Sequence, residues 1–164
     1  GAQRAHRDVV GRALGAAIPR QVVVVAVAVL LAVGQVLLVL ETHQIVEREA
    51  DPAQQVARIL GLVLQFAEKN PGMARVMAGD ALVFENERLA TRMNQCFDRI
   101  ESLLRQSYKA LAEQRGSAQP TVEAQAQAAL AVSVLLGRLH RFARTGFKRL
   151  PTESLEAALR QLLA

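Results

Sequence analysis

Residues 82–115 read LVFENERLATRMNQCFDRIESLLRQSYKALAEQR, and they carry the clearest periodic pattern in the chain. Their apolar side chains recur at spacings of three, four or seven residues, at Leu82, Leu89, Met93, Phe97, Ile100, Leu104, Tyr108 and Leu111. Such spacing places these groups along one face of an α-helix. Gly116 follows, and glycine readily takes the left-handed conformation just after a helix. The stretch therefore predicts one long amphipathic helix that must pack against other helices.

The remainder of residues 43–164 also has helical patterning, with turn residues between the segments. Asp51-Pro52 predicts the start of a helix, and Asn70-Pro71 predicts its end, because the residue before proline is pushed out of the α region. Thr121 and Thr152 are the predicted N-caps of the last two helices. No strand-like alternation follows residue 41, so we expect an all-α body.

The composition gives little support to an enzyme. The single cysteine, Cys96, excludes an internal disulfide, and the histidines His6, His43 and His140 lack metal-ligand spacing. No glycine-rich phosphate loop occurs. The neighbouring carboxylates Glu85 and Glu87 are expected on a solvated helix face. We therefore predict no catalytic residues, no metal and no cofactor.

Positive charge is concentrated at the front of the chain. The net charge is +5, and residues 1–40 hold four arginines and one aspartate, a net of +3, which leaves +2 for the rest. The body is therefore close to balanced, unlike a basic clamp for nucleic acid. The body contains one basic stretch, made up of Arg138, Arg141, Arg144, Lys148 and Arg149. These cations either complement the negative C-terminal end of a helix or contact a phosphate or an acidic partner.

Residues 22–40 differ from the rest because they contain no charged side chain. A helix of this length would span about 28 Å, close to the roughly 30 Å hydrocarbon core of a bilayer. The segment fits a membrane span or signal anchor, a buried core helix or strand pair, or a stretch foreign to the rest of the chain. We accordingly divide the chain into an atypical segment, 1–42, and a helical domain, 43–164.

Several stretches of the body resemble the C-terminal domain of SlmA-type nucleoid occlusion factors, which are TetR-type regulators. They are QFAEKNPGM at 65–73, GDALVFE at 79–85, RMNQCFDRIE at 92–101, RLHRFAR at 138–144, Phe147-Lys148 and Pro151-Thr152. The matches keep their order over about residues 43–164.

The resemblance implies an all-α cytoplasmic, nucleoid-associated homodimer that antagonises assembly of the division protein FtsZ on chromosomal DNA. Its dimer interface would be a four-helix bundle from residues of about 121–145 and 152–163. The nearly all-apolar run 128–137 independently predicts self-association, because it is too apolar to face water. The residues expected at this interface are Leu130, Val134, Leu135, Leu159 and Leu162.

The resemblance also implies an FtsZ-binding surface at Leu62, Lys69 and Asn70. The family has arginine where this chain has Lys69. Lysine keeps the positive charge but lacks the planar guanidinium that can bind a carboxylate through two hydrogen bonds. The family's DNA-recognition signature is not found in residues 1–42, so we expect no sequence-specific DNA binding by this chain. Two alternatives stay open: a ligand-sensing TetR-type domain, with a cavity of about 300 Å³ or more among the helices of 53–115, and a helical protein anchored in a membrane through residues 22–40.

Overall fold

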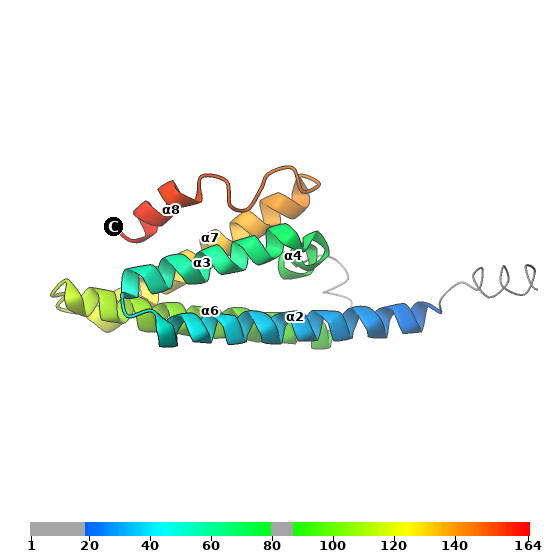
Figure 1. The fold of residues 1–164 in the computed structure, drawn as a ribbon, viewed down its shortest axis with the longest axis horizontal. Helices are drawn as coiled ribbons and strands as arrows, with labels where there is room; N and C mark the ends of the chain where they lie inside the picture. Colours follow the sequence, from blue (N-terminus) through cyan, green and yellow to red (C-terminus); the bar gives the residue numbers. More distant parts are fainter. Residues whose placement is uncertain (1–18, 80–86) are drawn as a thin grey trace, which may run out of the picture. The chain divides into compact units, whose positions relative to one another are not determined.

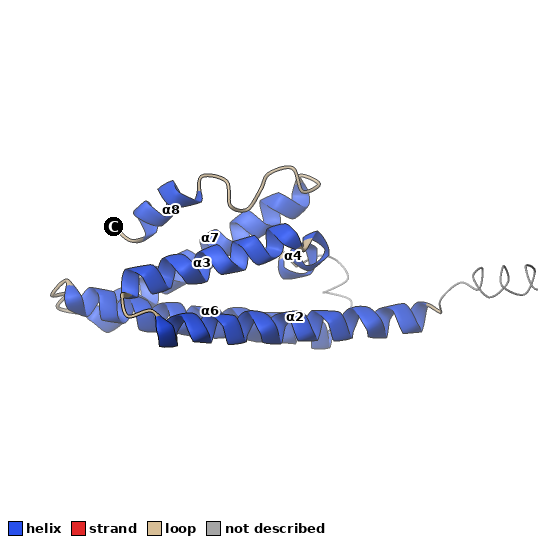
Figure 2. Cartoon of the chain, in the orientation of Figure 1, coloured by secondary structure: helices blue, strands red, loops and turns tan. Residues whose placement is uncertain are grey.

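A computed structural model of the chain describes residues 19–79 and 87–164 (Figure 1). Within these ranges the only regular elements are helices, and no strand occurs (Figure 2). The predicted all-α fold is therefore confirmed. The helices are α2 (Arg20–Arg48), α3 (Pro52–Lys69), α4 (Pro71–Met77), α6 (Glu87–Gln114), α7 (Pro120–Arg144) and α8 (Leu155–Leu162).

The chain divides into two compact units, residues 1–31 and 32–164. The described part of the first unit is the beginning of α2, whose valines at 22, 23, 25 and 29 are exposed. The arginines at positions 4, 7 and 12 lie outside the described residues, as does His6. Helix α2 has the length and composition to cross a membrane, and 19% of its most apolar window is buried.

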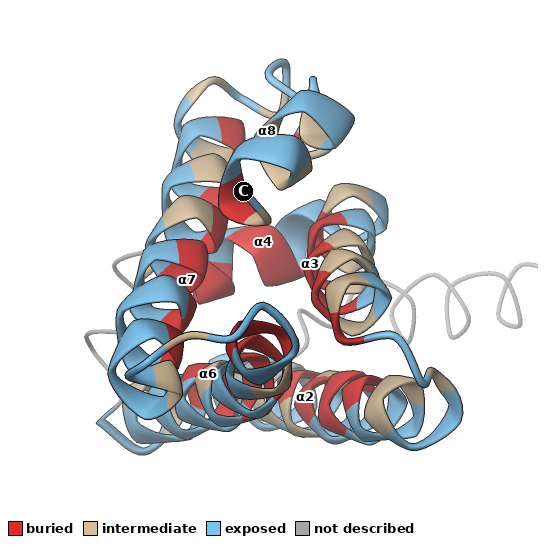
Figure 3. Cartoon of the chain, turned by 90° about the vertical axis from the view of Figure 1, so that its left-hand side faces the viewer, coloured by how far each residue is buried: buried red, intermediate tan, exposed pale blue. Residues whose placement is uncertain are grey.

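The core of the second unit lies between α3, α4, α6 and α7, whose buried faces point toward one another (Figure 3). Helices α6 and α7 form an antiparallel pair and make the most extensive helix–helix contact (Figure 1). The buried face of α6 follows the predicted periodicity, with Met93, Phe97, Ile100, Leu104, Tyr108 and Leu111 all buried. Residues 80–86, which include Leu82 and Glu85, lie outside the described residues.

The part of α2 that belongs to the second unit has a buried side and an exposed side, although apolar residues occur on both. Gln35, Leu38 and Thr42 are buried along one side, whereas Val36 and Leu40 are exposed on another. The Gln35 amide donates a hydrogen bond to the Met93 sulfur on α6. Residues 22–40 therefore belong to a helix, which excludes the alternative of a strand pair. This helix continues without a break past residue 42.

Most predicted helix ends are confirmed. Asp51 is the N-cap of α3, and its carboxylate accepts a hydrogen bond from the Ala53 N–H at 3.1 Å. Asn70 ends α3. After α6, Gly116 has a φ of +74°, and the Ser117 N–H donates to the Ala112 carbonyl at 3.0 Å. This is the Schellman arrangement that satisfies the last carbonyls of a helix.

The two threonine caps were predicted wrongly. Helix α7 begins at Pro120 after Gln119, so Thr121 lies inside the first turn. Helix α8 begins at Leu155 after Ser154, and the Thr152 hydroxyl instead donates to the Glu68 carboxylate at the end of α3. Proline at the first helical position and a tertiary hydrogen bond have outweighed the local capping preference.

The segment that carries α8 is held by hydrogen bonds to its backbone carbonyls. Arg138 on α7 donates to the carbonyls of Pro151, at 2.9 Å, and Glu153, at 2.6 Å. At the other end, the Tyr108 hydroxyl donates to the Leu162 carbonyl at 3.1 Å. Burial raises the pKa of Tyr108 to about 12. These donors from α6 and α7 position a helix that buries only one of its own residues, Leu162.

Candidate partner-binding surfaces

The outer side of α3 carries two of the residues expected to bind a partner. Leu62 is half-buried and Lys69 is exposed. They are seven residues apart, which places them on one face of the helix. Arg58 and Gln65 lie on the same face and are exposed, so this stripe holds apolar, amide and cationic groups together.

A groove of about 460 Å³ runs beside this stripe. Its α3 wall includes Gly61, Leu62 and Gln65, while Ile45 of α2 and Leu155 of α8 complete the lining. We did not anticipate Ile45, Arg58, Gln65 and Leu155 from the sequence. For Arg58 and Gln65 a signal existed, because they are four residues before and three residues after Leu62.

Asn70 is exposed and belongs to the helix end. Its side-chain amide donates to the Phe66 carbonyl at 2.8 Å, and its backbone N–H donates to the Ala67 carbonyl at 3.2 Å. Both bonds satisfy carbonyls that would otherwise lack an intrahelical partner. The structure therefore places Leu62 near the middle of α3, Lys69 at its last position and Asn70 at its C-cap, and it gives Asn70 a structural task as well.

Helix α7 presents an exposed face that is unusually poor in charge over its middle turns. Leu130 is 52% exposed, and Ser133 and Gly137 are exposed near it. Val134 is half-buried beside this face, and Leu159 is half-buried on α8. These positions remain available to a second copy of the chain.

Two residues expected at a dimer interface instead lie in the core of the single chain. Leu135 is 1% exposed and Leu162 is 7% exposed. Leu135 lies on the buried face of α7, together with Ala131 and Leu139. Neither side chain has apolar area left to bury against a partner, so the interface candidates reduce to Leu130, Val134 and Leu159.

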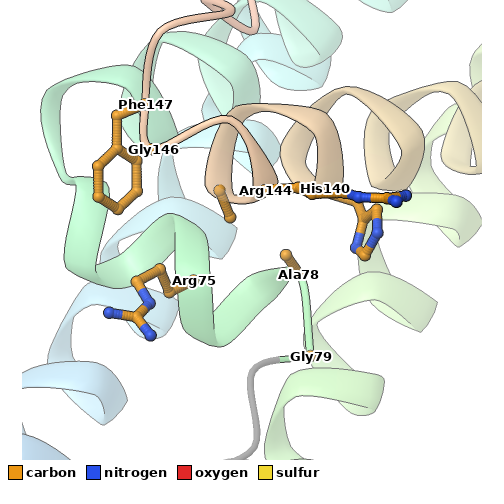
Figure 4. A pocket seen from close by; sticks show the side chains of 8 residues that line it. Arg75, Ala78, Gly79, His140, Arg144, Gly146 and Phe147 are labelled. Atoms are coloured by element: carbon orange, nitrogen blue, oxygen red, sulfur yellow. The ribbon is translucent and has the colours of Figure 1, made fainter.

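The basic stretch is divided between two environments. Arg138 is turned toward the α7–α8 connection, where burial and the nearby Arg141 lower its pKa and Glu153 partly offsets them. Arg149 pairs with Glu153 at 3.1 Å. Arg144 instead lines a cleft between α4 and α7, beside His140 (Figure 4).

Other candidate groups have ordinary surroundings. Cys96 is buried, and burial raises the pKa of its thiol, which disfavours the reactive thiolate. Within residues 19–79 and 87–164, no three His, Cys, Asp or Glu side chains are grouped as a metal site would require.

A cavity of about 320 Å³ lies among α4, α6 and α7 and includes Met93, Phe97 and Leu136 in its lining.

Residues 51–164 match the family model described as the SlmA-like tetracyclin repressor-like C-terminal domain. The chain is 44% identical over 114 residues to the nucleoid occlusion factor SlmA of Vibrio vulnificus strain YJ016, which covers 70% of this chain and 58% of that protein. It is 42% identical over 112 residues to SlmA of Aliivibrio fischeri strain MJ11, covering 68% of this chain and 57% of that protein.

The family model covers the described helices from α3 onward and begins after α2. The chain spans less than two thirds of the length of these relatives. The family description and the relatives' names are those of regulatory proteins. The chain belongs to the SlmA-like family of tetracyclin repressor-like C-terminal domains.

Proposed function

We propose that this chain provides the self-associating, FtsZ-binding domain of a nucleoid occlusion factor that works at the nucleoid in the cytoplasm. The observation that carries the proposal is the stripe on α3, which places Leu62 and Lys69 on one accessible face beside a groove. The relatives' name supplies the biological setting. DNA binding by a complete protein of this family is part of the same proposal.

The stripe offers the mixture of groups that a protein partner needs. Leu62 supplies apolar area at the groove, and Gln65 and Asn70 supply amide groups for hydrogen bonds. Lys69 supplies a positive charge for an acidic segment of the partner. Interfaces of this kind gain specificity and association rate from charge complementarity, and affinity from the apolar contacts.

Self-association is assigned to α7 and α8. The exposed face of α7 around Leu130, together with Leu159 on α8, has apolar area that would be buried in a symmetric dimer. The small residues Ser133 and Gly137 would let a partner helix approach closely. Arg138 donates to carbonyls of the segment before α8, and Tyr108 donates to the Leu162 carbonyl, so these bonds do not use the Leu159 side chain.

Reversing one charge on α3 tests the FtsZ assignment. Lys69→Glu should weaken binding of purified FtsZ by about tenfold or more, because the variant places like charges together at the contact. Lys69 is exposed, so the free energy of unfolding should change by about 0.5 kcal/mol or less. Binding can be followed by biolayer interferometry, and stability by urea denaturation.

Lys109→Glu is the matched control, since Lys109 is exposed on α6 and makes the same charge change outside the stripe. FtsZ binding by this control should stay within about twofold of the parent. Equal binding by the parent and Lys69→Glu would remove Lys69 from the site. No binding by the parent, with its dimer intact, would refute the FtsZ assignment for this domain.

A second candidate function is the sensing of a small ligand. The cavity of about 320 Å³ among α4, α6 and α7 meets the size expected of a ligand site. Phe97→Ala would enlarge this cavity. The variant should therefore change the rise in melting temperature that a true ligand produces in a metabolite screen. A screen with no stabilising compound would count against sensing.

A further inference from the structure

A groove between α2 and α6 is distinct from the α3 stripe, from the α7 face around Leu130 and from the cavity among α4, α6 and α7. It has a volume of about 310 Å³, and all of its lining residues belong to the second unit. The two helices lie side by side in Figure 3. Helix α6 supplies Arg92, Gln95, Cys96 and Arg99, and helix α2 supplies Ala32, Gln35, Val36 and Val39. The family model begins at residue 51, so the α2 wall of the groove lies outside the matched region.

The α6 wall of the groove is positively charged. Arg92 and Arg99 are exposed and lie seven residues apart, with Gln95 between them, so the three share one face of the helix over about 10 Å. The side chain of neither arginine makes a hydrogen bond or ion pair with the part of the chain that the structure describes. None of the described residues that line the groove is acidic. Because arginine carries its charge at any ordinary pH, this wall offers two uncompensated cations.

The buried part of the lining brings the charge close to the interior of the groove. Gln35 is 8% exposed, and its amide donates to the Met93 sulfur, which holds α2 against α6 at this point. Cys96 is 4% exposed. Burial raises the pKa of the Cys96 thiol, and the positive charge of Arg99 partly offsets this rise. The Arg99 guanidinium therefore acts on the groove itself and not only on the surrounding solvent.

The α2 wall is apolar and continues onto an exposed apolar face. Val39 is buried in the groove, and Val36 beside it is 57% exposed. Val33, Leu37 and Leu40 on the same helix are each just over half exposed. These exposed positions are three or four residues apart, so they form one apolar strip along the edge of the groove.

The contrast between the two walls decides which class of ligand fits. A lone inorganic anion would contact only the arginines, and an exposed ion pair strengthens binding by only about 1.5- to 5-fold. A neutral apolar compound would leave the arginines without a partner. An extended peptide would place its backbone N–H and C=O groups against valine side chains, where two helices have no free backbone groups to pair with them. An anion with a linear apolar chain uses both walls, because each methylene that it buries strengthens binding by about fourfold.

We propose that the α2–α6 groove binds a monomeric anionic amphiphile, in which a carboxylate or phosphate head carries one linear apolar chain. The guanidinium groups of Arg92 and Arg99 hold the head through charge-assisted hydrogen bonds, and the Gln95 amide is a further donor. The chain packs on Val36 and runs along the apolar strip of α2. The site depends neither on FtsZ binding at the α3 stripe nor on self-association through α7.

Isothermal titration calorimetry on the full chain tests this with decanoate and decyl phosphate, each kept below its micelle-forming concentration. The parent should bind at least one of them, and the tighter of the two identifies the head group. Shortening the chain of that ligand by two methylenes should weaken binding by about 4- to 16-fold, for half to full burial of the two groups. Decanol and acetate, which lack the charge and the chain respectively, should bind at least about fivefold more weakly than decanoate.

Site variants with matched controls locate the binding. Arg99→Glu should weaken binding by about fivefold or more, because attraction is replaced by repulsion. Arg105→Glu, the same reversal at an exposed α6 position outside the lining, should change binding by less than about twofold. Val36→Ser should weaken binding by about fourfold or more, whereas Val122→Ser, at an exposed valine of α7, should have less than about a twofold effect. Arg92→Glu is the second charge variant if Arg99→Glu loses helicity by circular dichroism.

The results that would overturn the proposal are distinct. Equal weakening by Arg99→Glu and Arg105→Glu, or by Val36→Ser and Val122→Ser, would show attraction without a site. Equal affinity for the longer and the shorter chain, or for decanoate and decanol, would remove one wall from the contact. No binding of either monomeric probe by the parent would overturn the proposal, and binding to phosphatidylglycerol vesicles alone would assign the face to a bilayer surface instead.

Discussion

Leu130 on α7 provides the sharpest test of self-association, because its side chain is accessible in the single chain. It is 52% exposed, whereas Leu135, five residues further on, is 1% exposed. Leu130→Asp should leave the protomer folded, while an aspartate at position 135 would bury an unpaired charge and unfold it. Only Leu130→Asp therefore tests the interface without unfolding the protomer.

The expected magnitude follows from the exposed fraction. Full burial of a leucine side chain contributes about 1.5–3 kcal/mol, so the exposed half of Leu130 has about 0.8–1.5 kcal/mol still to gain. A two-fold dimer uses the residue twice, which gives about 1.5–3 kcal/mol. Leu130→Ala should therefore raise the dimer dissociation constant by about 10- to 100-fold. Leu130→Asp should raise it further, because a carboxylate would lose water at the interface.

Sedimentation equilibrium over a concentration series measures this constant directly. Leu136→Ala is the matched control, because Leu136 is also a partly exposed leucine of α7 but lines the cavity on the α4 and α6 side. Its dissociation constant should stay within about threefold of the parent, and circular dichroism should show intact helices in all variants. A monomeric parent, an unchanged Leu130→Asp dimer, or equal weakening by Leu136→Ala would refute the assignment of the α7 face.

Two further predictions concern the attachment of α8. Tyr108 is the only tyrosine and there is no tryptophan, so tyrosinate absorbance in a pH titration should report a midpoint near pH 12 for this residue. Because its pKa is raised on folding from about 10, the contribution of Tyr108 to stability should be constant below pH 10 and should fall as the pH rises from 10 to 12. Arg138→Ala removes two hydrogen bonds to carbonyls of the α7–α8 connection and should lower the free energy of unfolding by about 1–3 kcal/mol in urea denaturation. An unchanged value would mean that the connection is held by other contacts.

The helix ends show which sequence signals are local. Asp51 and Gly116 were predicted correctly, because a cap bond and a left-handed glycine depend only on neighbouring residues. Thr152 was misassigned as a cap because its partner, Glu68, is 84 residues away. No local pattern reports a hydrogen bond over that separation.

The sequence of α7 does not show which side of the helix faces the core. The run 128–137 is apolar around most of the helix, so periodicity does not distinguish the core side from the partner side. Composition predicts Leu135 at the interface, but its burial together with Ala131 and Leu139 assigns it to the core. On α3 the pattern is clearer, because the polar side chains of the stripe mark its accessible face. Leu62 and Lys69 were named through the family resemblance, and their spacing of seven residues agrees with one shared face.

The bond between Thr152 and Glu68 links the end of α3 that carries Lys69 to the segment that leads into α8. Glu68 immediately precedes Lys69 at the end of α3, and Thr152 lies in the segment between α7 and α8. Arg138 fixes the same segment to α7 through the Pro151 and Glu153 carbonyls. A variant that displaces this segment would therefore disturb the α3 stripe and the self-association face together. Leu130→Asp and Lys69→Glu avoid it, since both change exposed side chains outside the segment, so FtsZ binding and dimerisation can be measured separately with these two variants.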